Sequence, residues 1–182
     1  ARVVYVESGT DAAGLADVNR LGALAFAALQ RLPPHLSTPH KAFDPELRAE
    51  IEALRFVDDE YRLFGGRGNE GAVIVSQSDA PVDFARMLAC RVANLVPVDD
   101  LDDAVRSVNA YTQTIGIFPE SLKARLRDRL AYQGAQRLTS LGGAATLMGS
   151  ATPQDGIEPV RRMVKWIVDE TGDGDALEAA AI

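Results

Sequence analysis

The sequence of 182 residues contains only one cysteine, Cys90. A single thiol cannot close an internal disulfide, and this is typical of a protein in a reducing compartment, so we expect a cytoplasmic location. Apolar runs of the roughly 18 residues that a membrane-spanning helix needs are missing. A charged leader followed by an apolar stretch is missing at residue 1 as well. We therefore expect neither a membrane span nor a secretory signal.

Positive charge is also scarce, because 26 acidic residues outnumber 19 basic ones and give a net charge of −7. An acidic protein repels a phosphate backbone, so we do not expect nucleic acid as the main partner. This charge balance still permits a local basic pocket for a phosphorylated ligand.

What the sequence does contain is the balance of one globular domain, with 47% hydrophobic and 25% charged residues. Short β-branched runs predict strands at residues 3–6, 72–76, 91–98, 112–118 and 135–141. Apolar residues at helical spacing predict helices at residues 11–32, 45–54, 99–108, 119–134 and 158–170. The alternation predicts an α/β fold of three layers, in which a mostly parallel sheet carries helices on both faces.

Cap residues mark the ends of several of these helices. Thr10 is the expected N-cap of the first helix, and Asp44 caps the second, with Pro45 at its first position. Pro119 is expected to open the fourth helix and Gly134 to close it.

The segments between these elements are less regular. Three prolines make residues 33–40 a loop, residues 142–156 form a second loop, and residues 55–64 favour neither helix nor strand. Gly22 stands inside the first helix, where the missing side chain permits another element to approach closely. Residues 171–182 are an acidic, alanine-rich tail that we expect to fray.

The string GRGNEG at residues 66–71 fits the G-x-G-x-x-G pattern of dinucleotide-binding loops. That function requires a preceding strand and a helix that begins within the string, because the helix N-terminus meets the pyrophosphate. Here residues 72–76 predict a strand instead of a helix. We therefore interpret the string as a glycine-rich turn between two strands.

Three isolated residues are candidates for other chemistry. Cys90 is a candidate nucleophile, but it precedes an apolar strand, and we expect a buried structural thiol. His35 and His40 lie five positions apart in the proline-rich loop, with no second ligand pair to complete a zinc site. A catalytic histidine from this loop remains open.

Two acidic clusters resemble metal sites. Carboxylates at a helix start oppose the positive end of the helix dipole and accept hydrogen bonds from free N–H groups. Capping therefore explains the first cluster without a metal, and its members are Asp99, Asp100, Asp102 and Asp103. A calcium loop that starts at Asp169 fails, because its twelfth position is Ala180, where a bidentate glutamate is required.

The segment SLGGAATLMGS at residues 140–150 is the candidate ligand-binding loop. It follows a predicted strand, and ligands in α/β folds gather at the carboxyl ends of strands. Small residues there can border an acyl chain or a nucleotide, which makes Ser140, Gly142 and Gly143 the expected substrate-binding residues. A connection that binds no ligand explains the same composition equally well.

Several segments, taken in order, resemble the aldehyde dehydrogenase superfamily, and most closely its acyl-CoA reductase branch of LuxC type. They are RVVYVE at residues 2–7, FGG at residues 64–66 and CRVANLVPVDDLDDAVRSVNAYTQTIGIFPESL at residues 90–122. GAQRLTSLG at residues 134–142 and DGIEPVRRMVKWIVDE at residues 155–170 fit the reductase branch better than ordinary aldehyde dehydrogenases. The resemblance covers residues 2–170.

The resemblance implies that residues 1–170 are a portion of that family's catalytic domain. In the family the nucleophilic cysteine precedes the RVVYVE-like strand by a few residues, so it would lie upstream of Ala1, together with the nicotinamide-binding domain. Cys90 does not occupy the nucleophile's position. Residues 87–92 also lack the glutamate with which the superfamily contacts the cofactor ribose. The resemblance therefore assigns no catalytic residue to this chain.

The implied reaction is the reduction of an acyl-CoA thioester to the aldehyde. A cysteine thiolate attacks the thioester and releases CoA, and the acyl-enzyme then accepts hydride from NADPH or NADH. No metal is implied. The expected partners are acyl-CoA and the rest of the parent polypeptide, and a homo-oligomer is left open. The chain alone is expected to be inactive.

Two alternatives remain. A non-catalytic domain of the same fold, kept for interaction and assembly, predicts a parent polypeptide with no cysteine immediately before Ala1. An independent thiol enzyme would use Cys90 as its nucleophile, and the pH dependence of the alkylation rate of this thiol tests that alternative.

Overall fold

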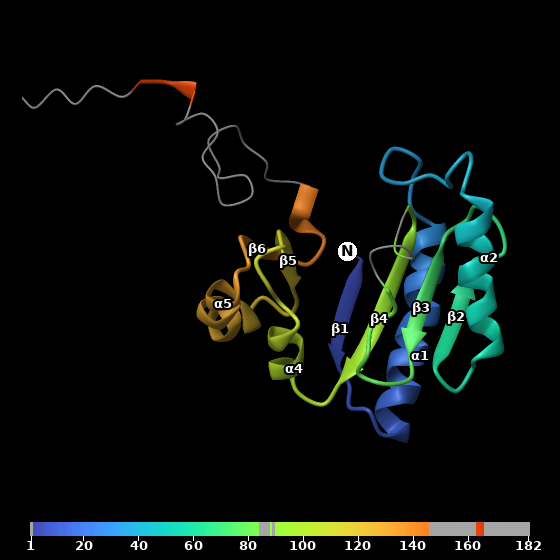
Figure 1. Ribbon diagram of the computed structural model, residues 1–182, viewed down its shortest axis with the longest axis horizontal. Helices are drawn as coiled ribbons and strands as arrows, with labels where there is room; N and C mark the ends of the chain where they lie inside the picture. Colours follow the sequence, from blue (N-terminus) through green and yellow to red (C-terminus); the bar gives the residue numbers. More distant parts are fainter. Residues whose placement is uncertain (1, 84–87, 89, 146–162, 166–182) are drawn as a thin grey trace, which may run out of the picture.

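The computed structural model of the chain describes residues 2–83, 88, 90–145 and 163–165. Its main sheet has four strands in the order β1 (Val3–Glu7), β4 (Val92–Val98), β3 (Ala72–Ser76) and β2 (Tyr61–Gly65). The first three run parallel, and β2 joins them antiparallel at the edge. α1 (Ala12–Gln30) covers one face of this sheet and α2 (Pro45–Ala53) covers the other (Figure 1). The predicted three-layer α/β fold is confirmed.

Alternation along β3 explains the two helical layers. Val73 and Val75 pack in the apolar cluster beneath α1, whereas Ala72 and Ile74 pack in the cluster that contains Ile51 of α2. Because every residue of β3 is buried, its sequence is a continuous apolar run, as in other strands that are covered on both faces.

The N-cap of α1 is Asp11, and the prediction of Thr10 is wrong. The Asp11 carboxylate accepts a hydrogen bond from the Gly14 N–H at 2.8 Å, because its side chain folds over the free N–H groups of the first turn. Thr10 instead donates from its N and Oγ1 to Asp99 Oδ1, at 2.7 and 2.9 Å. These contacts tie the start of α1 to the end of β4.

The predictions on the other side of the sheet are confirmed. The Asp44 side chain caps α2 by accepting a hydrogen bond from the Glu46 N–H at 2.9 Å, and Pro45 is the first residue of that helix. Residues 33–40 form neither helix nor strand. The ambiguous residues 55–64 divide between a short 3₁₀-helix, η1 (Leu54–Phe56), a turn, and the start of β2.

A smaller unit follows β4. Its elements are α4 (Leu101–Arg106), β5 (Thr114–Ile117), α5 (Leu122–Gln133) and β6 (Arg137–Ser140), and β5 pairs with β6 in parallel. The two helices bury Val105, Leu126 and Leu130 against Ile117. The predicted strands are therefore divided between two sheets, a detail that the alternation of elements does not specify.

The ends of α5 match the prediction only in part. Gly134 closes the helix as predicted, with a left-handed φ of +113°. The helix begins at Leu122 and not at Pro119, because Pro119 O accepts a hydrogen bond from the Leu122 N–H at 3.0 Å in a preceding turn. A second short 3₁₀-helix, η2 (Gly143–Ala145), interrupts the loop predicted at residues 142–156.

In the described part of the chain, α1 is the one helix long and apolar enough, by length and composition alone, to cross a membrane. This is a weak signal, and the helix packs on the sheet through Val18 and Gly22. Most of the helix predicted at residues 158–170 lies outside the described residues. The calcium-type segment from Asp169 and the tail at residues 171–182 lie wholly outside them.

Candidate functional site

The expected substrate-binding residues lie at the carboxyl ends of β5 and β6. Parallel pairing places Ile117 beside Ser140 at the last step of the register, and the Leu141 N–H donates to Ile117 O at 3.0 Å. The segments that leave the two strands are therefore neighbours. This is the position at which ligands bind in open α/β sheets.

Ser140 has a partner that the sequence did not indicate. Its Oγ donates to Glu120 Oε2 at 2.6 Å, and Glu120 also forms an ion pair with Lys123. The hydrogen bond from Lys123 is the main cause that holds the pKa of Glu120 below its ordinary value, and the hydrogen bond from Ser140 adds to it. Twenty residues separate Ser140 and Glu120 in the chain, so only the pairing of β5 with β6 brings them together.

The glycines after Ser140 shape a tight turn. Gly142 has a φ of +85°, a left-handed conformation that favours glycine, and, its two chain neighbours apart, no atom of the described residues lies within 4 Å of where a Cβ would be. Gly143 begins η2, and Arg137 Nη1 donates to Ala144 O at 2.8 Å, which fastens this short helix to β6. The turn therefore combines a fixed backbone with open space beside Gly142.

Apolar side chains flank this turn. Phe118, just after β5, is 77% exposed, and Leu141, just after β6, is 50% exposed. Leu141 directly follows Ser140, and Phe118 directly follows Ile117, the register partner of Ser140. Such a surface can hold an apolar chain and offer it a hydroxyl group.

Within the described residues, this surface does not show the paired nucleophile and base of a nucleophilic enzyme. A hydroxyl becomes a nucleophile when an adjacent base removes its proton. Glu120 is a weak base because its pKa is lowered. Among the described residues, His35 and His40 lie in the exposed loop before α2, where His40 Nδ1 accepts a hydrogen bond from the Ala42 N–H at 3.2 Å. The described residues therefore give the Ser140 hydroxyl no strong base that could activate it as a nucleophile.

The GRGNEG string is a hairpin turn, as predicted. It joins β2 to β3, and the Gly66 N–H donates to Gly71 O at 2.9 Å across its base. The turn before α1 is a poor alternative for a pyrophosphate, because Asp11 already caps that helix and Asp99 lies beside it. Neither of these two turns therefore fits the pyrophosphate of a nicotinamide dinucleotide.

Cys90 is exposed, so the prediction of a buried thiol is wrong. The residue lies in the turn that precedes β4, with a left-handed φ of +54°. β4 begins only at Val92, and the apolar sequence after Cys90 does not extend the buried strand back to the cysteine. This single thiol has no base or second ligand beside it that the structure records.

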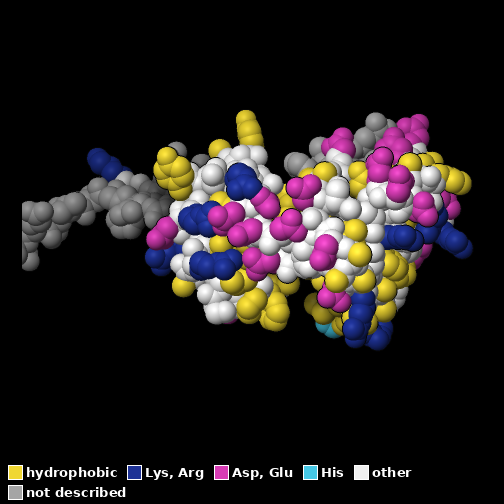
Figure 2. All heavy atoms as spheres, turned by 90° about the horizontal axis from the view of Figure 1, so that it is seen from below, with side chains coloured by type: hydrophobic (Ala, Val, Ile, Leu, Met, Phe, Trp, Pro, Cys, Tyr) yellow, Lys and Arg dark blue, Asp and Glu magenta, His cyan; other side chains and the backbone are white. Residues whose placement is uncertain are grey.

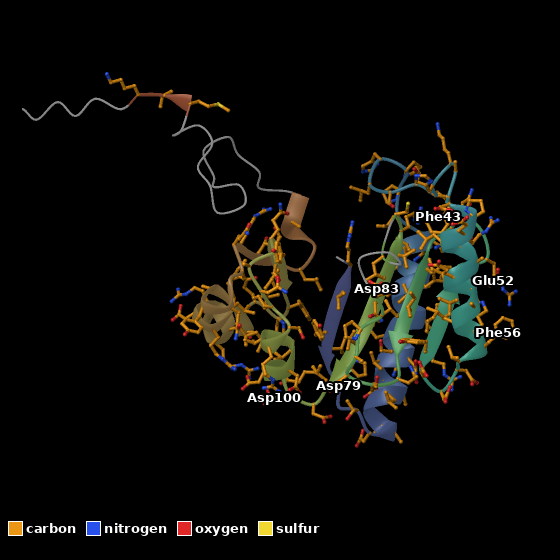
Figure 3. All side chains as sticks on the ribbon, viewed as in Figure 1. Phe43, Glu52, Phe56, Asp79, Asp83 and Asp100 are labelled. Atoms are coloured by element: carbon orange, nitrogen blue, oxygen red, sulfur yellow. The ribbon has the colours of Figure 1, made fainter. Side chains whose placement is uncertain are left out.

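In the acidic cluster, Asp100 caps α4 as predicted, whereas Asp99 accepts hydrogen bonds from Thr10 at the start of α1. The carboxylate of Asp100 (Figure 3) accepts a hydrogen bond from the Asp102 N–H at 2.8 Å. Asp102 pairs with Arg129 of α5, and Asp103 pairs with Arg106. Figure 2 shows acidic and basic side chains interleaved over this unit. A search of the described residues finds no group of three or more potential metal ligands.

Comparison with known proteins matches this chain to a family of reductases. The sequence model of the acyl-CoA reductase (LuxC) family matches residues 1–166. A long-chain acyl-protein thioester reductase of Photorhabdus laumondii is 33% identical over 98 residues, which are 53% of this chain and 20% of the relative. Long-chain acyl-protein thioester reductase 2 of Photobacterium leiognathi is 30% identical over 105 residues, 57% of this chain and 22% of the relative. The matches therefore span about a fifth of each relative.

Proposed function

Because the chain belongs to the acyl-CoA reductase (LuxC) family, we propose that it is part of an enzyme that reduces an acyl thioester to the aldehyde with NADPH or NADH. The match of the family model over residues 1–166 carries this proposal. The names of the two relatives support a long-chain acyl group held as a thioester of a protein, and the family description supports a thioester of CoA. A cytoplasmic location is part of the same proposal.

We assign to this chain the binding of the acyl group. Phe118 and Leu141 supply apolar surface at the carboxyl ends of β5 and β6. Ser140, Gly142 and Gly143 form the turn beside them, in which the open space at Gly142 leaves room for a chain to pass. Burial of an acyl chain against this surface removes apolar area from water and so favours binding.

The covalent step belongs to a cysteine outside residues 1–182. Its sulfur forms a bond to the acyl carbonyl carbon, the carbon–sulfur bond of the thioester breaks, and the thiol of CoA or the carrier protein leaves with a proton. A nicotinamide cofactor would supply hydride to the acyl carbonyl carbon, the bond between that carbon and the cysteine sulfur would break, and the aldehyde would leave with the cysteine thiolate restored. Since neither the GRGNEG turn nor the turn before α1 suits the pyrophosphate of that cofactor, its site is also proposed to lie outside this chain. No metal is required.

The proposal is tested by comparing the complete reductase polypeptide with the 182-residue chain. Each is mixed with NADPH and a long-chain acyl-CoA, and both cofactor oxidation and aldehyde are measured. We expect activity only in the complete polypeptide. Reduction by the chain alone would contradict a nucleophile outside it. Inactivity of the complete polypeptide would favour the non-catalytic assembly domain.

The binding surface has its own test in the complete polypeptide. Leu141→Asp places a charge on the apolar surface and should raise KM for a long-chain acyl thioester about tenfold, the cost of losing one buried leucine. Tyr132→Asp is the matched control, because Tyr132 is 91% exposed on α5 and outside the proposed surface. Equal changes of KM for the two substitutions would contradict the assignment of acyl binding to this surface.

A further inference from the structure

The two edges of the main sheet are unlike each other. At one edge, alternate carbonyls of β2 point away from β3, and Arg55 donates to two of them, Leu63 O and Gly65 O. The other edge is β1, which among the described residues pairs with β4 alone and is met by α4 and Arg125 at its last residue, Glu7 (Figure 1). Proteins commonly cover or block their sheet edges, because an open edge invites pairing with another strand. In the described part of the chain, Arg55 blocks the β2 edge, and no side chain is recorded in a hydrogen bond to the outward backbone groups of β1.

The backbone groups along the open edge of β1 can be identified. The Asn94 N–H of β4 donates to Arg2 O at 2.8 Å. Since backbone groups alternate in direction along a strand, Val4 and Val6 also face β4, while Val3, Tyr5 and Glu7 face away from it. Outside the pairing with β4, the described part of the chain gives these outward backbone groups no hydrogen-bond partner.

The composition of β1 is that of an interior strand. Its sequence VVYVE is a continuous apolar run over four residues, as in β3 and β4, and such runs are typical of parallel strands with neighbours on both sides. Residues of β3 and β4 are almost all buried, whereas the first four residues of β1 are only half-buried. β1 therefore has the sequence of a strand with two neighbours and, in this structure, has one.

An apolar flank of α1 lies on the same side. Phe26 packs toward β2, because a Cβ at Gly65 would meet its ring. Leu21 and Leu24 lie on the opposite flank of the helix at helical spacing, which is the flank toward β1 in the strand order. They are 40% and 56% exposed. This flank of the helix therefore presents two large apolar side chains that the described part of the chain leaves exposed.

We propose that the open edge of β1 and the Leu21–Leu24 flank of α1 form one docking surface for another part of the same reductase polypeptide, which adds a strand to β1 and covers the flank. The relatives identify this occupant, because about four-fifths of their length lies outside the matched segments. A strand supplies the missing hydrogen bonds, and an apolar cover suits a permanent interface. The proposal rests on membership in the family and not on the reaction.

The test co-expresses the 182-residue chain with the remainder of its reductase polypeptide as two separate chains, one of them tagged. We expect the two chains to purify together. Leu24→Lys should weaken their association about tenfold or more, since it replaces a buried leucine by a charge. Ala23→Lys is the matched control, because Ala23 is the exposed neighbour on the outward side of α1, and it should leave association unchanged.

A second pair of variants tests the strand. Tyr5→Pro removes an outward N–H that β4 does not use, so it should weaken association while the chain alone keeps its circular dichroism; Tyr5→Phe is its control. Failure of the wild-type chains to associate, or equal association of all variants, would overturn the proposal. So would light scattering that shows the chain alone as a dimer which Leu24→Lys dissociates, because the occupant would then be a second copy. The experiment measures association of the two chains and not aldehyde formation. A failure of this proposal can therefore be told apart from a failure of the proposed reaction.

Discussion

At the scale of single residues, the Asn94 side chain forms hydrogen bonds that connect several parts of the main sheet. It is fully buried in the middle of β4. Its Nδ2 donates to Ile74 O and Ser76 Oγ, both at 3.1 Å, and its Oδ1 accepts from the Val82 N–H at 3.0 Å. One amide group thus joins β4 to β3 and fastens the segment that connects them.

Asn94→Ala should lower the free energy of unfolding by about 2–3 kcal/mol, because it leaves the buried Val82 N–H without an acceptor. Urea unfolding followed by circular dichroism measures this loss. Asn19→Ala is the control, since the Asn19–Gln77 hydrogen bonds are only partly buried and should contribute about 1 kcal/mol or less. A loss for Asn94→Ala no larger than the control's would contradict the role assigned to this amide.

The second prediction at this scale concerns Glu120 in the candidate site. Ser140→Ala should raise the pKa of Glu120 toward its ordinary value of 4.5, though not fully, because Lys123 is the larger cause of the lowered pKa. Carboxyl-carbon NMR titration measures this directly. Lys123→Met should raise the same pKa by more, and the reverse order would contradict the ranking of the two contacts.

The same contact sets a pH dependence of stability. A carboxyl group whose pKa is lower in the folded than in the unfolded state stabilises the fold above its unfolded pKa. The contribution of Glu120 is therefore complete above its ordinary value of 4.5 and is lost as the pH falls through the lowered pKa of the folded state. Because Glu120 is exposed, this contribution is small, and the NMR titration is the more sensitive measurement.

At the scale of elements, close packing of α1 on the sheet depends on Gly22. A Cβ at this position would lie 2.4 Å from Val75 Cγ2 and 2.9 Å from Phe64 Cε2. The sequence-based expectation that Gly22 permits a close approach is therefore confirmed. Val75 is fully buried and β-branched, so it cannot move aside cheaply.

Gly22→Val should lower the free energy of unfolding by about 2 kcal/mol or more, because overpacking separates α1 from β3. Helix propensity alone predicts that Gly22→Val raises the free energy of unfolding, since glycine is the poorer helix former. Ala23→Val on the exposed side of the same helix is the control, with an expected change below about 1 kcal/mol. Thermal and urea unfolding of both variants measure the difference, and a stabilised Gly22→Val variant would show that the contact is loose.

At the scale of the whole molecule, the chain forms two layered units of unequal size. The four-stranded sheet has an apolar cluster on each face, whereas β5 and β6 pack on one cluster with α4 and α5. The units meet where Glu7 of β1 accepts from the Leu101 N–H at 3.4 Å and lies 3.8 Å from Arg125 Nη2. These contacts are exposed, so we assign them little stability.

Hydrogen exchange should therefore be uneven. We expect amides in β3 and β4 to exchange at least about tenfold more slowly than those in β5 and β6, because an amide paired between two buried strands opens only with the larger unit. Exchange followed by mass spectrometry resolves these segments. Equal protection of β4 and β5 would mean that the two units unfold together.

Much of the local structure could be predicted because its causes are local. Asp44 and Pro45 begin α2, Gly134 ends α5, and the strand after the GRGNEG string excludes a dinucleotide loop from the sequence pattern alone. The wrong predictions of local structure concern the residues at which helices begin. Thr10 and Asp11 are both good caps, and the contact with Asp99, 89 residues away from Thr10, decides between them.

The loop of the candidate site could be predicted from the sequence, but the residues from other segments that complete its surface could not. The small residues after β6 mark Ser140, Gly142 and Gly143, because composition and position are properties of the sequence. Glu120 and the exposed Phe118 could not be found in this way, since only the parallel pairing of β5 and β6 brings them to Ser140 and Leu141. Cys90 shows the same limit, because burial depends on where β4 begins in space.

The sequence by itself determined the α/β class, the order of most helices and strands, and the resemblance to a reductase family. Those properties follow from periodicity, caps and motifs within short stretches of chain. Only the tertiary structure decided that the strands form two sheets, that Asn94 and Glu120 have the partners described above, and that β1 has an open edge beside an apolar helix flank. The physical reason is that strand register and order depend on contacts between residues far apart in the chain, which local patterns do not specify.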